Sequence, residues 1–166
     1  MMNHLLRTPR LFAGLLLLML VTWVEAQVDS PISHLLQTDQ PPEGVVFEIV
    51  TGDEGALEWA IPRTQQYIQQ LRGKFPDLPI AVVTHGREMF SLQKRNEYGS
   101  QDVHKQVKSL VAQQDVVLHV CGTYASWKGL AEEDFPTYVD VAAAGPAQIN
   151  DYVAIGYVKI IIKDQD

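Results

Sequence analysis

The residue with the clearest chemical potential is Cys121, the single cysteine of this 166-residue chain. It follows the apolar run Val116–Val120 and precedes Gly122 and Thr123, which predicts a sulfur at the end of a strand and the start of a helix. The free N–H groups and the dipole at such a position favour the anionic thiolate, the nucleophilic form of cysteine. The alternative is a buried cysteine that packs as a small apolar side chain. The sequence leaves both interpretations open.

A lone thiol restricts the reactions that the chain could perform. Phosphatase and rhodanese loops close on an arginine at the position that Trp127 occupies here. Disulfide exchange within one subunit needs a second cysteine, which the chain lacks. A hydrolase could pair Cys121 with His85 or His119, but the sequence shows no third residue to orient either histidine. Carrying sulfur as a persulfide needs one nucleophilic cysteine, a stabilised anion, and a donor and an acceptor that dock in turn.

Other groups able to surround this thiol lie in the loops that follow the strands. His85 and Arg87 come directly after the apolar run Ile80–Thr84, and ligands in parallel sheets bind beyond the carboxyl ends of strands. We expect His85 to stabilise the Cys121 thiolate. The predicted site has Cys121 and His85 as catalytic residues and Gly122, Thr123, Trp127 and Arg87 as pocket residues. For Arg87, an ion pair with a carboxylate is the competing interpretation. No spacing of His, Asp or Glu indicates a metal site, and no cofactor is predicted.

The elements that must position these residues alternate along the chain. Short β-rich runs at 45–50, 80–84, 116–120, 138–141 and 157–162 predict five strands. Amphipathic stretches at 56–72 and 102–114, a short segment after Cys121 and a segment opened by Gly145-Pro146 predict about four helices. Continuous apolar strands such as Val116-Val117-Leu118 are typical of sheets covered on both faces. The predicted fold class is therefore α/β, with three α/β/α layers and a mostly parallel five-stranded sheet.

The N-terminal residues predict export. Arg7 and Arg10 precede an apolar run of residues 11–24, and Ala26 ends a small-residue cleavage site, so residues 1–26 are typical of a secretory signal peptide. An uncleaved membrane anchor is the alternative. Residues 27–43 predict a flexible tether, and residues 44–166 a single domain. We expect a soluble exported protein, periplasmic if the source is a bacterium, with no membrane contact after cleavage.

The overall composition excludes some classes of function. Hydrophobic residues make up 46% of the chain, which is too apolar for disorder. The 13 basic and 20 acidic side chains give a formal net charge of -7. A nucleic-acid partner is therefore not expected, because binding phosphates requires a clustered surplus of Lys and Arg.

Several short motifs follow one another along the domain. They are His85-Gly86-Arg87-Glu88, His119-Val120-Cys121-Gly122-Thr123, Gly129-Leu130, Glu132-Glu133-Asp134, Gly145 before a helix and Gly156-Tyr157-Val158 in the last strand. As a set, over residues 44–163, they resemble the DsrE/DsrF-like (DsrE family) sulfur-relay proteins. The resemblance implies a three-layer α/β fold, homotrimers or hexamers, and a cysteine at the position of Cys121 that carries persulfide sulfur between partner proteins. Cys121 is the residue that this resemblance carries over.

Two main functions are compatible with these residues. The first is an exported sulfur-handling protein that carries or transfers persulfide sulfur on Cys121, like a sulfurtransferase, with sulfur donors and acceptors that are proteins or small sulfur compounds. The second is a non-catalytic oligomeric module that binds a small anion or a partner protein, with a structural Cys121. A hydrolase that uses Cys121 ranks last.

Overall fold

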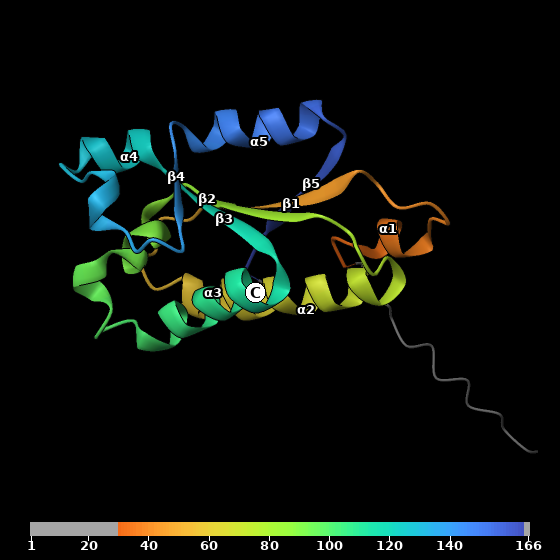
Figure 1. Cartoon of the computed structure of the whole chain (residues 1–166), viewed down its shortest axis with the longest axis horizontal. Helices are drawn as coiled ribbons and strands as arrows, with labels where there is room; N and C mark the ends of the chain where they lie inside the picture. Colours follow the sequence, from red (N-terminus) through yellow and green to blue (C-terminus); the bar gives the residue numbers. More distant parts are fainter. Residues whose placement is uncertain (1–29, 165–166) are drawn as a thin grey trace, which may run out of the picture.

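Five parallel strands form the centre of the protein in a computed structural model that describes residues 30–164 (Figure 1). The strands are β1 (Gly44–Ile49), β2 (Ile80–Thr84), β3 (Val116–Cys121), β4 (Asp140–Ala142) and β5 (Tyr157–Ile162). Their order in the sheet is β4-β3-β2-β1-β5, and every neighbouring pair is parallel. All carboxyl ends therefore meet at one rim of the sheet, as the site prediction requires.

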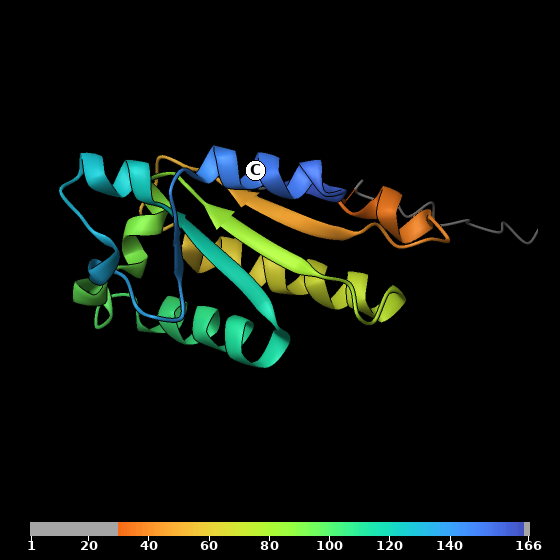
Figure 2. The ribbon, with the colours of Figure 1, turned by 45° about the horizontal axis from the view of Figure 1, so that its top comes forward.

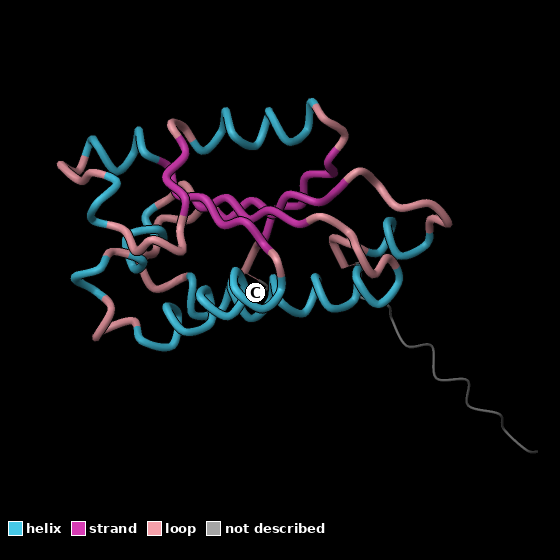
Figure 3. The backbone as a smooth tube through the Cα atoms, viewed as in Figure 1, coloured by secondary structure: helices cyan, strands magenta, loops and turns pink. Residues whose placement is uncertain are grey.

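Helices cover both faces of this sheet. The helices α2 (Leu57–Lys74) and α3 (Gln101–Gln114) lie on one face, and α4 (Gly122–Trp127) and α5 (Gly145–Ala154) lie on the other. Figure 3 shows the strands between the two helical layers, and in Figure 2 β1 and β2 run side by side beneath α5. Three short 3-10 helices, η1 (Arg87–Leu92), η2 (Lys94–Asn96) and η3 (Glu132–Asp134), belong to the connections. The three-layer α/β fold with a parallel five-stranded sheet is confirmed.

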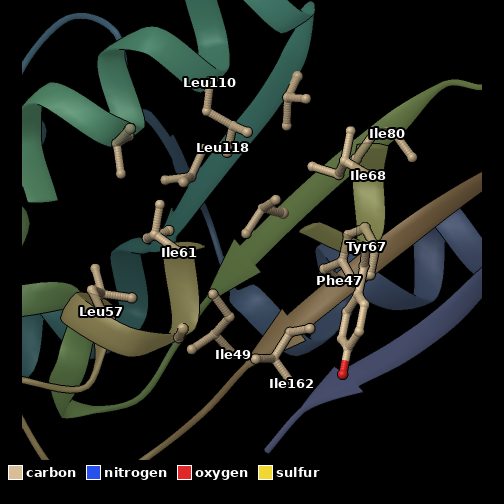
Figure 4. Close-up of a cluster of buried hydrophobic side chains, with 14 of the residues drawn as sticks. Phe47, Ile49, Leu57, Ile61, Tyr67, Ile68, Ile80, Leu110, Leu118 and Ile162 are labelled. Atoms are coloured by element: carbon tan, nitrogen blue, oxygen red, sulfur yellow. The ribbon is translucent and has the colours of Figure 1, made fainter. Parts of the chain in front are cut away.

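The two faces of the sheet differ in what they bury. The main apolar core lies between the sheet and the α2–α3 layer, where Phe47, Ile49 and Leu118 face Ile61 and Leu110 (Figure 4). This core supplies most of the apolar surface that folding removes from water. The core on the α5 side is small and consists of Val46, Ala81, Val83 and Ile149, with Tyr152 and Tyr157 packed against it. The α5 face has room for polar groups, and the candidate site lies there.

The N-terminal part of the domain differs from the expectation. We expected residues 27–43 to be a tether, but α1 (Ser33–Gln37) forms within this stretch and packs on α2. Ile32 and Leu35 are buried in the main core, because two apolar residues one helical turn apart cover the same surface. The tether prediction is therefore wrong for this segment. The predicted signal peptide, residues 1–26, lies outside the described residues.

Smaller differences concern the ends of elements. The fourth strand begins at Asp140 instead of residue 138, and β3 includes Cys121 itself. The described residues form five α-helices where about four were expected, the additional one being α1. None of the described helices is long and apolar enough to cross a membrane.

Candidate functional site

Cys121 is the last residue of β3 and lies at the carboxyl rim of the sheet. Its Sγ accepts a hydrogen bond of 3.5 Å from the backbone N–H of Tyr124, so the side chain caps the start of α4. Cys121 is only 5% exposed, but it borders a pocket of about 620 Å³. The pocket is lined by His85, Cys121, Thr123, Tyr124, Trp127, Ala144, Pro146, Ala147 and Asn150. We call it the thiol pocket.

The first turn of α5 forms one wall of this pocket. Gly145 lies so close to the other side chains that a Cβ there would be 2.6 Å from the Cβ of His85 and 3.3 Å from the Cβ of Cys121. Glycine thus allows α5 to begin directly against both candidate residues. The first N–H groups of a helix have no partner within the helix, and they favour negative charge beside them. Pro146, the second residue of α5, has no N–H group, so the backbone N–H groups that the beginning of α5 can bring to the thiol pocket are those of Gly145 and Ala147.

His85 enters the thiol pocket with one ring nitrogen already bound. Its Nε2 lies 2.8 Å from Oε1 of Glu48, and Oε2 of Glu48 lies 3.1 Å from Nζ of Lys159. These three residues come from the loop after β2, from β1 and from β5. Burial raises the pKa of Glu48, but hydrogen bonds from His85 and Lys159 outweigh it and leave the pKa below its usual value. Glu48 stays ionised and orients the imidazole, which leaves Nδ1 as the nitrogen available to a group in the pocket.

The loop that carries His85 is held by a second carboxylate, Glu88. It is fully buried, and its Oε1 accepts hydrogen bonds from the Thr84 hydroxyl at 2.6 Å and the Gly86 N–H at 2.8 Å. Its Oε2 accepts one from the Thr51 N–H at 2.8 Å. Glu88 therefore ties the loop after β1 to the loop after β2. Gly86 has no space for a side chain, because a Cβ would lie 2.3 Å from Oε2 of Glu88.

Neither Glu48 nor Glu88 was expected to be part of the site. A signal for Glu48 was present, since it is the one charged residue in the apolar run Val45–Val50. An isolated charge in a strand expected to be buried needs a partner. Which partner it has depends on strand order, because β2 and β5 flank β1 in the sheet but not in the sequence.

The structure brings together most of the residues predicted for the site. His85, Thr123 and Trp127 line the thiol pocket with Cys121, and Trp127 is 75% exposed at its edge. Gly122 begins α4 and lies against the backbone of β4, where a Cβ would be 2.9 Å from the Ala142 carbonyl oxygen. The hydroxyl of Thr123 donates to the carbonyl of Ala143 at 2.7 Å, so this residue joins α4 to the segment before α5.

Arg87 does not take part in the thiol pocket. Its guanidinium donates to Oε1 of Glu54 at 2.7 Å, and this exposed ion pair raises the Arg87 pKa. The structure therefore favours the competing interpretation of Arg87, a solvated ion pair, over a role beside the thiolate. His119 also stays out of this pocket: its Nε2 lies 2.9 Å from the Tyr152 hydroxyl, as expected for a histidine satisfied in the interior.

No cluster of three His, Cys, Asp or Glu side chains within residues 30–164 has the arrangement of a metal site. The site thus consists of a single thiol, an oriented imidazole and the start of a helix, at the rim of a parallel α/β sheet. These features define a three-layer α/β protein with one cysteine in an apolar pocket.

Comparisons with solved structures agree with this architecture. The chain is similar to MTH1491 from Methanobacterium thermoautotrophicum, a protein of unknown function, with 25% identity, a TM-score of 0.56, and coverage of 70% of this chain and 96% of that one. It is also similar to BT1422 from Bacteroides thetaiotaomicron, with 11% identity, a TM-score of 0.51 and coverage of 72% and 95%. The YchN protein of E. coli is 12% identical, with a TM-score of 0.47 and coverage of 71% of this chain and 98% of that one.

The likenesses to MTH1491 and BT1422 support a DsrE-like fold for this chain. They cover nearly the whole length of both proteins. No family model matches the sequence, and no curated protein matches it significantly.

Proposed function

We propose that this protein carries sulfur as a persulfide on Cys121. The observation that carries the proposal is the placement of the thiol, at a strand end, beside an apolar pocket that also holds an oriented His85. The Tyr124 N–H and the start of α5 offer positive partial charge to the sulfur. The pocket is large enough for a small sulfur compound or the end of a partner's side chain.

The reaction needs only groups that the site contains and a donor. With thiosulfate as the donor, the Cys121 thiolate attacks the outer sulfur, a new S–S bond forms at Sγ, and the S–S bond of thiosulfate breaks. Sulfite leaves with the electron pair. An acceptor thiolate then attacks the outer sulfur of the persulfide, takes it as its own persulfide, and returns Cys121 to the thiolate. Each step exchanges one S–S bond for another, so no separate oxidant or reductant is consumed.

Mass spectrometry tests this proposal directly. After incubation with polysulfide or thiosulfate, we expect the intact protein to gain the mass of one sulfur atom, and the gain to disappear with dithiothreitol. Cys121→Ser should show no gain. His85→Gln should gain sulfur more slowly, because it removes the imidazole from the pocket but keeps the thiol. Absence of the adduct in the native protein, or its presence in Cys121→Ser, would contradict sulfur carriage.

A second function is favoured by the low exposure of the thiol. At 5% exposure, Cys121 could be structural, and the pocket would then serve a non-catalytic oligomeric module that binds a small anion or a partner protein. In that case Cys121 should resist alkylation by iodoacetamide in the native protein and react only after unfolding. Sulfur carriage requires the opposite result, because a sulfur donor of similar size must reach Sγ.

A third candidate function is a hydrolase that uses Cys121 as its nucleophile. The sequence showed no third residue that could orient the histidine of such a hydrolase. Glu48 is able to do so, because its Oε1 is hydrogen-bonded to Nε2 of His85. A covalent acyl intermediate at Cys121 would be the sign of such an activity.

We also propose that the protein forms a homo-oligomer and is exported. Exposed apolar side chains on the α5 side of the sheet, among them Val117, Val153 and Ile155, support a homo-oligomer, such as a trimer or hexamer. Light scattering after gel filtration would show its mass. Export rests on residues 1–26, and the N-terminal sequence of the protein recovered from cells would show whether cleavage follows Ala26.

A further inference from the structure

A second pocket, of about 590 Å³, lies next to the thiol pocket and has a different character. It is formed by η1, η2 and the segment that follows α4, and three cationic side chains border it: Arg87, Arg95 and Lys128. We call it the basic pocket. Arg87 shares its charge with Glu54, which also borders the pocket. Within the described residues, no ion pair joins Arg95 or Lys128 to a carboxylate.

This concentration of positive charge is unusual for the chain as a whole. The protein carries a formal net charge of -7, so unpaired cations that share one concave surface stand out against an acidic background. Like charges brought together repel one another unless an anion lies between them. A ligand with negative charge would remove this repulsion, and the pocket can hold one.

An independent observation at the same place is the side chain of Gln93. It lies between η1 and η2, borders the basic pocket, and is only 3% exposed. Its Oε1 is buried and has no hydrogen-bond partner among the residues that the structure describes. A buried polar atom without a partner costs about 1–3 kcal/mol, so such atoms are uncommon unless a ligand or water completes them. Rotation of the amide exchanges its oxygen and its NH2 group, so Gln93 can present either a donor or an acceptor to a ligand.

The basic pocket shares a wall with the thiol pocket but is separate from it. Tyr124 borders the thiol pocket, and its ring packs at 5.1 Å, centroid to centroid, against Phe90, which borders the basic pocket. Nζ of Lys128 lies 6.0 Å from the centre of the Tyr124 ring. A ligand in the basic pocket would therefore lie across Tyr124 from the thiol.

We propose that the basic pocket binds a small tetrahedral oxyanion with two negative charges, of the sulfate, phosphate and thiosulfate type. The guanidinium groups of Arg87 and Arg95 can each present two parallel N–H groups to such oxygens, and Lys128 adds a mobile point charge. The amide of Gln93 completes the set from the buried side. The proposal does not depend on sulfur carriage at Cys121, because none of these side chains touches the thiol.

Isothermal titration calorimetry with sulfate, phosphate and thiosulfate, at constant ionic strength maintained with chloride, tests the proposal. We expect saturable binding of one anion per chain, and the anion with the lowest Kd identifies the ligand. The double variant Arg95→Gln/Lys128→Gln should weaken binding at least about tenfold, which corresponds to the loss of charge-assisted hydrogen bonds. Lys108→Gln, which removes a cation from the exposed surface of α3, is the matched control and should bind like the wild type. Absence of saturable binding, or equal Kd values for the double variant and the wild type, would overturn the proposal.

Gln93→Leu separates a ligand-binding role from a structural one. The leucine removes an unpartnered polar atom and keeps a similar volume, so without anion the variant should unfold at the same temperature as the wild type or higher. Its affinity for the anion should nevertheless fall at least about threefold, since one hydrogen bond is lost. A lower unfolding temperature together with unchanged affinity would show that Gln93 is structural and would overturn this geometry for the site.

Discussion

Replacing Glu88 with glutamine should destabilise the protein far more than its similar shape suggests. The carboxylate receives three hydrogen bonds, two on Oε1 and one on Oε2. Glutamine keeps one acceptor oxygen and replaces the other by an NH2 group. In either orientation of the amide, a backbone N–H, that of Thr51 or that of Gly86, faces this NH2 group. One charge-assisted hydrogen bond is therefore lost, and two buried donors, the backbone N–H and the NH2 group of the glutamine, point at each other without an acceptor.

The size of this effect follows from the burial of the group. Hydrogen bonds to charged groups contribute about 1.5–3 kcal/mol each, and a buried donor without a partner adds a penalty of about 1–3 kcal/mol. We therefore expect Glu88→Gln to lower the free energy of unfolding by about 2.5–6 kcal/mol, a large part of the total of about 5–15 kcal/mol that is usual for a domain. The loop that carries His85 should also loosen, because Glu88 holds Gly86, the residue after His85.

Urea denaturation followed by circular dichroism measures the change, provided that the slope m of the unfolding curve stays constant. Glu132→Gln makes the same chemical change at an exposed residue and should stay within about 0.5 kcal/mol of the wild type. Hydrogen exchange at the amide of Gly86 reports on the loop itself. A loss below about 1 kcal/mol for Glu88→Gln, with unchanged m, would refute the view that this carboxylate holds the two loops together.

Three further changes test other parts of the site. Gly145→Ala places a Cβ 2.6 Å from the Cβ of His85 and should lower the free energy of unfolding, measured by thermal denaturation, by about 1–3 kcal/mol. Gly99→Ala is the control that should be tolerated, because the nearest atom to its Cβ would be 3.7 Å away. Burial lowers the pKa of His119 below 6.5, although Asp140 partly opposes it. The unfolded chain therefore binds this proton more readily, and stability should fall as the pH falls below that value. When the pH is lowered from about 7.5 to about 5.5, the urea midpoint of His119→Gln should fall less than that of the wild type. An equal fall in both proteins would contradict a lowered pKa for His119. Trp127→Ala should change stability by no more than about 0.5 kcal/mol, because Trp127 is 75% exposed, yet it should slow sulfur loading of Cys121 in the mass assay. Equal loading rates would exclude Trp127 from the donor site.

Much of the fold could be predicted because the apolar runs of parallel strands are continuous. Each of the five strands forms at an expected run, and β5 has the expected bounds of residues 157–162. The segment before β1 was misjudged because its few apolar residues, among them Ile32 and Leu35, lie among prolines and polar residues. A helix of five residues has almost no intrinsic stability, so it exists here only through its contact with α2.

The candidate site was predicted in part. A cysteine at a strand end and a histidine at the next strand end were expected to meet, and both border one pocket. The carboxylate that orients His85 was not expected, because Glu48 lies 37 residues before it in the chain. Arg87 was placed near the thiol by its sequence position, but its side chain turns to Glu54. Position along a loop does not determine the direction in which a long flexible side chain points.

The sequence by itself determined the class of fold, the lone thiol and its place at the end of a strand, since these depend on local pattern and on residue type. Only the tertiary structure decided the order of the strands. That order places Glu48 of β1 between Lys159 of β5 and His85 of the loop after β2, so that Glu48 contacts both. It also brings the first turn of α5 against Cys121. Ion pairs and hydrogen bonds act over a few ångströms, so their partners are fixed by neighbours in space. The order in which the strands pack in the sheet determines those neighbours.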